Sequence, residues 1–238
     1  MKGLQRNILL GFTCFLLFNS LDTSAQRRKF SYKTSKSISF GVNAGANYSN
    51  LIPQNSQGTQ FKTGIYAGGF FEYMLPADFG IEVEANFASL GGENVPTEIL
   101  FNPNSILLND TKSLDLMMYG VEVPVIAKYH FSSLYPELFV GIGASGMYIL
   151  KSQAALNRIL NFNGTYTSVT TFIDVSKKVQ TMMASGVFCT GIRYPIGSME
   201  ISVTAGITYG ITDLSANNVV NGNGFRTKSF RLGVSLGF

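Results

Sequence analysis

Apolar and polar residues alternate with a period of two along most of the chain after residue 37. Between Ile38 and Tyr48 one parity is apolar, and the other carries small or polar residues such as Ser39 and Asn43. Alternation of this kind is typical of a β-strand with one apolar face. The pattern predicts eight strands: Ile38–Tyr48, Gly64–Leu75, Gly80–Ala88, Leu116–His130, Leu138–Leu150, Val179–Tyr194, Met199–Ile211 and Ser229–Phe238.

The segments between these strands alternate in length. The short ones each contain a proline and lie near Pro76–Phe79, Ser132–Pro136 and Pro195–Ser198. The long ones lie near Ser49–Phe61, Ser89–Ser113, Ser152–Lys178 and Thr212–Lys228. An even number of antiparallel strands, with short turns at one end and long loops at the other, is typical of outer-membrane barrels. We therefore expect an all-β fold, an eight-stranded antiparallel up-and-down transmembrane β-barrel of OmpA/OmpX-like size, over residues 38–238.

The charged residues indicate which face of each strand points outward. Glu82 and Lys128, for example, fall on the parity opposite to the apolar rows, so the apolar rows are predicted to face lipid. Charged residues make up only 13% of the chain, against about a quarter in water-soluble domains. A soluble β-sandwich or lipocalin-like barrel, the alternative, would carry its charges outside. The sixth strand has the least clear pattern; we predict Met182, Phe188, Ile192 and Tyr194 outward and Arg193 inward.

Aromatic residues lie near the ends of the predicted strands on the outward parity, where their rings suit the membrane interface. This set comprises Tyr48, Tyr73, Phe87, Tyr129, Tyr148, Tyr194, Tyr209 and Phe238.

The N-terminus has the features of a signal peptide over residues 1–25. Lys2 and Arg6 precede a short apolar stretch, and small residues end at Ala25. A membrane anchor is the alternative, but a spanning helix needs about 20 apolar residues. Residues 26–37 are then a basic periplasmic tail, which either contacts anionic lipid or an envelope partner or is simply solvated. Only Cys189 remains after cleavage, so no intramolecular disulfide is expected.

The inward parity carries charges that a narrow interior cannot leave isolated. Eight strands leave an interior just wide enough for side chains to fill it. We therefore predict a lumen closed by salt bridges, with a proton or ion path as the alternative. The predicted lumen charge network is Glu72, Glu82, Glu84, Glu122, Lys128, Arg193, Glu200 and Arg231.

Residues for catalysis are scarce in the predicted mature chain. Its one histidine, His130, ends a strand beside a short turn, where we expect an interfacial polar residue rather than a catalytic base. No catalytic, cofactor-binding or metal-binding residues are predicted, although an outer-membrane lipid hydrolase is a weaker alternative. The long loop Ser89–Ser113 is unusually apolar; it either binds a partner or dips into the outer leaflet, or packs over the barrel mouth. Its apolar residues are Ile99, Leu100, Phe101, Ile106, Leu107 and Leu108.

Several stretches resemble the PorT-like outer-membrane β-barrel family, which is common in Bacteroidetes. They are Phe40–Leu51, Glu84–Gly92, Tyr119–Tyr129, with its Glu-x-Pro pattern followed by Lys-Tyr, and Tyr209–Leu214. The family often has an Arg-Tyr pair where this chain has Gly206-Ile207, so a role of that arginine does not carry over. The resemblance implies the barrel fold. Because the family is named after a member involved in type IX protein secretion, it also suggests an accessory role in secretion or transport.

The chain ends in an alternating apolar row with a terminal aromatic residue. Leu232, Val234, Leu236 and Phe238 resemble the signal that the barrel-assembly machinery recognises. The expected partners are therefore outer-membrane lipid, the barrel-assembly machinery and envelope or secretion proteins. Nucleic acid is not expected, because a net charge of +4 is small and dispersed. The predicted function is that of a non-enzymatic integral outer-membrane protein with a structural or interaction role at the cell envelope.

Overall fold

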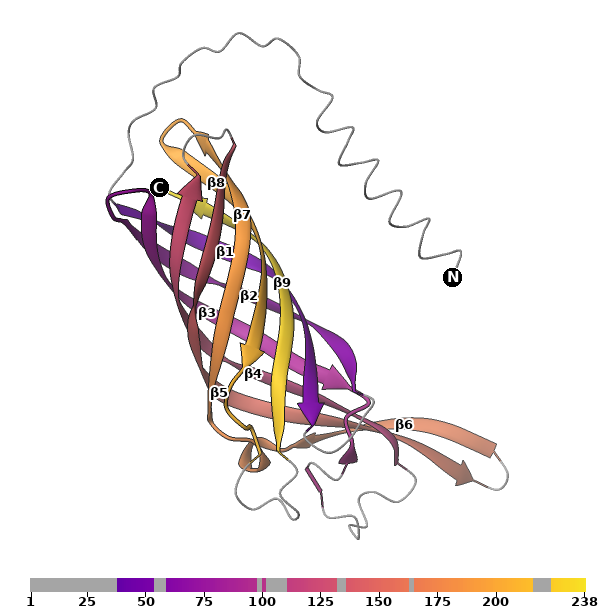
Figure 1. Ribbon diagram of the computed structural model, residues 1–238. Coiled ribbons are helices and arrows are strands. Elements are labelled where there is room, and N and C mark those ends of the chain that lie inside the picture. The colour runs from indigo at the N-terminus through magenta and orange to yellow at the C-terminus, as the bar shows by residue number, and fades with distance from the viewer. Residues whose placement is uncertain are drawn as a thin grey trace, which may run out of the picture. The chain divides into compact units, whose positions relative to one another are not determined.

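The computed structural model describes residues 38–53, 59–97, 100–101, 111–131, 136–162, 165–215 and 224–238. The predicted signal peptide and periplasmic tail lie outside these residues. Nine strands are described (Figure 1): β1 (Ile38–Pro53), β2 (Gln60–Met74), β3 (Phe79–Glu93), β4 (Thr111–Phe131), β5 (Glu137–Phe162), β6 (Thr165–Asp174), β7 (Met182–Ile196), β8 (Met199–Gly210) and β9 (Phe225–Gly237). A short 3-10 helix, η3 (Ser176–Lys178), precedes β7. In the described ranges no helix is long and apolar enough to cross a membrane.

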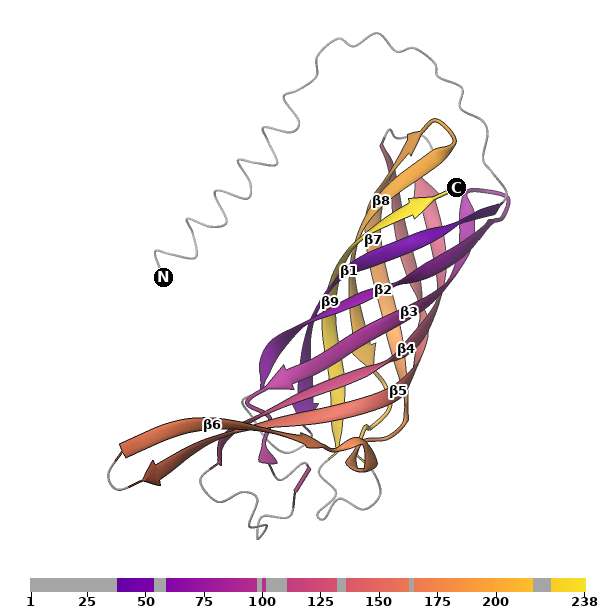
Figure 2. The ribbon, with the colours of Figure 1, turned by 180° about the vertical axis from the view of Figure 1, so that it is seen from behind.

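Eight of the strands close into a barrel, and every pairing between them is antiparallel. Each strand pairs with its neighbour in the chain, except that β5 passes over β6 to pair with β7. β1 pairs with β9, the last strand of the chain, and β4 pairs with β5, so the ring of strands is closed and the wall has no open edge. Figures 1 and 2 show that the strands are tilted relative to the barrel axis, as a closed barrel requires. The predicted eight-stranded antiparallel barrel is confirmed.

The outward face of the wall is apolar, as the alternation predicts. Val123 is 43% exposed and Ile201 37% exposed, whereas Glu122 is fully buried inside. A soluble barrel would show the reverse arrangement. The assignment of the sixth barrel strand is also confirmed: its predicted outward residues are exposed, and Arg193 is buried.

The prediction of a loop over Ser152–Lys178 was wrong. β5 continues to Phe162 and pairs with β6, and this hairpin projects beyond the barrel wall (Figures 1 and 2). Outside the membrane, neither face of a hairpin contacts lipid, so the apolar row that marks the other strands is absent. The β-branched residues of β6, such as Thr167, Val169 and Thr171, were the remaining strand signal.

A β-bulge links the wall part of β5 to this hairpin. Ile149 pairs with Gly120 and Lys151 with Tyr119, which leaves Leu150 as an extra residue on β5. The extra residue reverses the parity of β5 beyond it. As a result Leu156, although on the parity that faces lipid below the bulge, is fully buried at the loop end of the barrel.

Candidate functional site

The interior of the barrel is the candidate site, and its turn end holds a cluster of ionisable side chains. Glu72 of β2 accepts a hydrogen bond from the guanidinium of Arg193 on β7 and lies 2.9 Å from Nε2 of His130 on β4. Nδ1 of His130 lies 2.6 Å from a carboxylate oxygen of Glu137 at the start of β5. Arg193 also reaches Glu200 on β8, with Nη1 3.7 Å from Oε2. Side chains from five strands are thereby connected across the lumen.

The prediction for His130 was wrong. Its side chain is 1% exposed, so it is a buried residue of the lumen and not an interfacial one. Its backbone amide donates a hydrogen bond to the backbone carbonyl of Asp78 in the β2–β3 turn, at 2.9 Å. This bond positions the end of β4. The parity of His130 is that of Glu122 and Lys128 and places it on the inward face; its position beside a turn led to the interfacial assignment.

A second group of charges lies further from the turns. The ammonium of Lys128 lies 2.5 Å from Glu82 and 4.6 Å from the ring centroid of Phe139. Glu84, by contrast, has no ion-pair partner within 4.0 Å among the described residues; it accepts hydrogen bonds from the side-chain amides of Asn43 at 2.9 Å and Asn86 at 2.5 Å. These asparagines were not predicted as site residues, although both lie on the inward parity of their strands.

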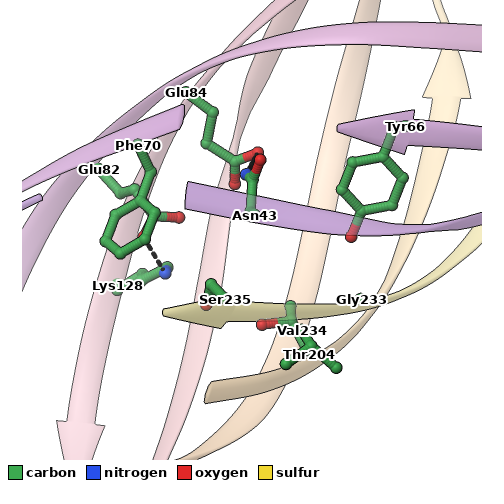
Figure 3. A pocket seen from close by; sticks show the side chains of 10 residues that line it. All are labelled: Asn43, Tyr66, Phe70, Glu82, Glu84, Lys128, Thr204, Gly233, Val234 and Ser235. Carbon is green, nitrogen blue, oxygen red and sulfur yellow. Dashed lines mark hydrogen bonds and ion pairs between the residues drawn. The ribbon is translucent and has the colours of Figure 1, made fainter. Parts of the chain in front are cut away.

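A cavity of about 40 Å³ separates these two carboxylates from β8 and β9 (Figure 3). In Figure 3, Glu82 and Lys128 lie together on one side of the cavity, and Asn43 lies beside Glu84. A cavity of this volume has room for about two or three water molecules. Its lining is mixed, with Phe70 and Val234 beside Glu82, Glu84 and Lys128, and these charged groups suit water rather than an apolar ligand.

The third charged pair is Glu122 with Arg231. Glu122 is fully buried on β4, and it accepts hydrogen bonds from the Arg231 guanidinium and from the hydroxyl of Ser145 at 2.5 Å. The guanidinium also lies 5.6 Å from the ring centroid of Tyr66. This ring needs the glycine opposite it, because a Cβ at Gly233 would lie 1.9 Å from the Tyr66 hydroxyl oxygen.

At the loop end the interior changes from polar to apolar. The loop after β3 contributes Leu100 and Phe101, which are 2% and 4% exposed. Their packing agrees with the prediction that this loop packs over the mouth; Ile99, Ile106, Leu107 and Leu108 lie outside the described residues. We call the whole group the mouth cluster: Leu51, Leu90, Val95, Leu100, Phe101, Leu114, Leu116, Met118, Met147, Ile149, Ala154, Leu156, Val175, Val179, Met183, Leu214 and Phe225.

Lys178 of η3 holds the β3–β4 loop onto the mouth cluster. Its ammonium donates to the Leu100 carbonyl at 2.7 Å and lies 4.0 Å from the ring centroid of Phe101. Partial burial lowers the pKa of Lys178, because the charged form loses hydration. This contact was not predicted from the sequence, since Lys178 and Leu100 lie 78 positions apart in separate loops.

The structure places the eight predicted lumen charges in the barrel, distributed over the groups above. It brings together Glu72, Arg193 and Glu200, then Glu82 with Lys128, and then Glu122 with Arg231, whereas Glu84 is held by amides. The residues of the predicted assembly signal lie on β9 and the terminal residue beyond it; Leu232, Val234 and Phe238 are exposed on the outer face, and Leu236 is partly exposed. In the described part of the chain, no group of three or more His, Cys, Asp and Glu could hold a metal ion.

Comparison with known proteins places the chain among outer-membrane proteins. Residues 24–216 match the sequence model of a family described as outer membrane protein beta-barrel domain. The similar solved structures include Neisserial surface protein A, at 16% identity over 84% of this chain and 97% of that one, with a TM-score of 0.43. They also include a major outer membrane protein of Thermus thermophilus, at 12% identity, 84% and 99% coverage and a TM-score of 0.46. The third is Ail of Yersinia pestis in complex with a heparin analogue, at 12% identity, 84% and 99% coverage and a TM-score of 0.39. No curated protein sequence matches the chain.

The family match covers most of the chain and includes every barrel strand from β1 to β8. The chain therefore belongs to the outer membrane protein beta-barrel domain family and resides in the cell outer membrane.

Proposed function

We propose that this protein is a non-enzymatic interaction protein of the outer membrane, which acts through the hairpin of β5 and β6 outside the cell. The observation that carries the proposal is the extension of the hairpin past the wall with one free edge among the described residues. The closed interior supports it, because a filled barrel leaves the external segments as the parts available for function.

The lumen supports an interaction role over transport. Salt bridges such as Arg193–Glu72 cross its turn end, and the mouth cluster fills its loop end. Between them, in the described part of the barrel, the cavity beside Glu84 has room for only about two or three water molecules. A hydrated solute would have to break buried ion pairs to pass, and removing one partner of such a pair costs about 3–5 kcal/mol.

The hairpin has the features of an accessible strand edge. β6 pairs only with β5 among the described residues, and no charged residue or proline lies between Thr165 and Ile173. Proteins usually protect such edges with lysine, proline or a bulge. Phe172 is 72% exposed beside this edge. An extended segment of a partner can add to an edge of this kind, with backbone hydrogen bonds for affinity and a side-chain contact for specificity.

Photo-crosslinking in intact cells tests the proposal. A photoreactive residue replaces Thr170 on β6, and the control replaces Phe87, which faces lipid on β3. We expect a discrete protein adduct from position 170, lost in a Phe172→Asp variant, and only lipid adducts from position 87. Absence of a protein adduct at 170 in a correctly folded barrel would contradict the interaction role.

We also propose that the chain belongs to the PorT-like branch of the family. The residues of its Glu-x-Pro and Lys-Tyr patterns support this: Glu122 and Lys128 both point into the lumen and form ion pairs there. Their spacing therefore has a structural reason. Recovery of secretion components with the purified protein would test an accessory role, and purification without them would count against it.

A further inference from the structure

A group of rings and cations lies at the loop end of the lipid-facing wall. The ring of Phe61 on β2 stacks on Tyr48 of β1, with centroids 4.7 Å apart, and lies 5.7 Å from the centroid of Phe230 on β9. The ammonium of Lys228 lies over the Phe230 ring, 5.4 Å from its centroid. Arg226 follows on the same face of β9, two residues nearer the loops, and is exposed.

The register adds a hydroxyl group at the same level. Lys228 lies directly opposite Tyr209 of β8, and directly opposite residues on one face of a sheet have neighbouring side chains. Tyr209 is 46% exposed on the outer face. We call these residues the rim patch: Tyr48, Phe61, Tyr209, Arg226, Lys228 and Phe230.

The cations of the rim patch have no carboxylate counterion in the part of the chain that the structure describes. Among the described residues, neither Arg226 nor Lys228 lies within salt-bridge distance of an Asp or Glu. By contrast Lys62, close to the same end, is paired with Glu93 at 3.5 Å and Asp115 at 3.8 Å. The rim patch is thus a positively charged surface that borders the hydrocarbon-facing wall.

The two ends of the wall differ in the number of exposed cationic side chains. The exposed lysines and arginines of the described residues are Lys151, Lys177 and Arg226, and all three belong to the loop end. At the turn end the outward residues are apolar or aromatic, for example Phe40, Phe79 and Tyr129. Outward cations therefore lie on the side of the outer leaflet, where a lysine keeps its stem on apolar surface and its ammonium at the head groups.

We propose that the rim patch binds the phosphate of an anionic lipid head group in the outer leaflet. Arg226 and Lys228 supply the positive charge, and the Tyr209 hydroxyl donates a hydrogen bond to a phosphate oxygen. The stack of Tyr48, Phe61 and Phe230 provides the apolar surface for the adjoining acyl chain. This proposal goes beyond the interaction role of the hairpin and does not depend on it.

Tryptophan fluorescence provides a local test, since the chain contains no tryptophan. Phe230→Trp places a single reporter in the rim patch, and Tyr48→Trp provides a second one if the first disturbs folding. The folded protein is reconstituted in vesicles in which either phosphatidylglycerol or phosphatidylcholine carries brominated chains, and quenching measures which lipid occupies the patch. Phe87→Trp, on the wall away from these cations, is the matched reporter control.

We expect the rim reporter to select phosphatidylglycerol by about 25-fold, from two cations at about 1 kcal/mol each, and the Phe87→Trp reporter to select neither lipid. Each of Arg226→Gln and Lys228→Gln should lower the selectivity by about five-fold, from about 1 kcal/mol per cation at a membrane surface. Lys177→Gln removes the same charge from η3 and should leave selectivity unchanged. Equal quenching by both lipids, or no effect of the two rim substitutions, would overturn the proposal. Displacement of phosphatidylglycerol by excess inorganic phosphate would also overturn it, because a soluble anion would then be the ligand.

Discussion

Arg193 of β7 donates a hydrogen bond to Glu72 of β2 inside the barrel, although the two residues lie 121 positions apart in the chain. Glu72 is fully buried and Arg193 is 8% exposed, so water cannot hydrate either charge well if the pair is broken. The pair connects opposite parts of the wall near the turns. It is therefore expected to stabilise the closed barrel, not only two adjacent strands.

Breaking this pair should be costly. We expect Glu72→Gln or Arg193→Met to lower the free energy of unfolding by about 3 kcal/mol, because each removes the nearest partner of a buried charge. Among the described residues, Glu72 then keeps only its contact with His130, and Arg193 keeps only its longer contacts with Glu137 and Glu200. The double variant should lose less than the sum of the two, since no unpaired member of this pair remains. Urea unfolding of the barrel in lipid vesicles measures these values.

Lys62→Met is the control for the buried pair. It removes ion pairs with Glu93 and Asp115 that are partly open to water, and such pairs contribute at most about 1 kcal/mol. Additive effects of the Glu72 and Arg193 substitutions would show that the two side chains do not interact.

Close packing of Gly233 against Tyr66 gives a second prediction. Gly233→Val should destabilise the barrel by about 1–3 kcal/mol, because the new side chain overlaps the Tyr66 hydroxyl. Tyr66→Phe removes that oxygen and should recover part of the loss. Gly186→Ala is the control, as nothing lies within 4 Å of a Cβ there. Equal losses at the two glycines, measured by the same unfolding assay, would contradict the packing argument.

The contact of Lys178 with the β3–β4 loop predicts a local effect. Lys178→Met should raise the hydrogen-exchange rate of the Phe101 amide, which donates to the Thr97 carbonyl at 2.8 Å. The reason is that the loop loses both the hydrogen bond to Leu100 and the cation over Phe101. Lys177→Met, next to it but exposed, should leave the rate unchanged. Exchange that is identical in the two variants would show that Lys178 does not hold the loop.

Asp174, at the base of the hairpin, should make the stability of the folded form depend on pH. Hydrogen bonds from the side chain and backbone of Ser176 hold the pKa of Asp174 below its ordinary value. A depressed carboxyl pKa stabilises the folded form above the unfolded pKa, about 3.9, and this contribution disappears as the pH falls through the folded pKa. An NMR titration should therefore show Asp174 protonating below that ordinary value. Ser176→Ala should move the titration upward; an unchanged midpoint would exclude the hydrogen bonds as the cause.

The sequence predicted the wall of the barrel better than its interior. Lipid on one side and side chains on the other impose a period of two, so residues such as Val123 and Glu122 could be assigned to opposite faces from the alternation alone. The register between neighbouring strands determines which inward charges come into contact. This register cannot be predicted from the local alternation of residues. The pairing of Arg193 with Glu72 and the position of His130 between two carboxylates therefore required the three-dimensional structure.

The hairpin and the bulge were missed for a related reason. Beyond the membrane the lipid-facing row ends, so β6 carried only weak strand signals such as Thr167 and Val169. The extra residue at Leu150 reversed the parity of β5 within an otherwise regular pattern. Alternation alone gives no way to distinguish such a reversal from the start of a loop.

Side chains close the lumen from the ion pairs at Glu72 to the mouth cluster. Single-channel recording of the folded mature protein in planar bilayers is the decisive measurement of this closure. We expect the bilayer to stay at its baseline conductance, with no discrete openings across the applied voltages. Large and stable openings from the folded monomer would contradict it.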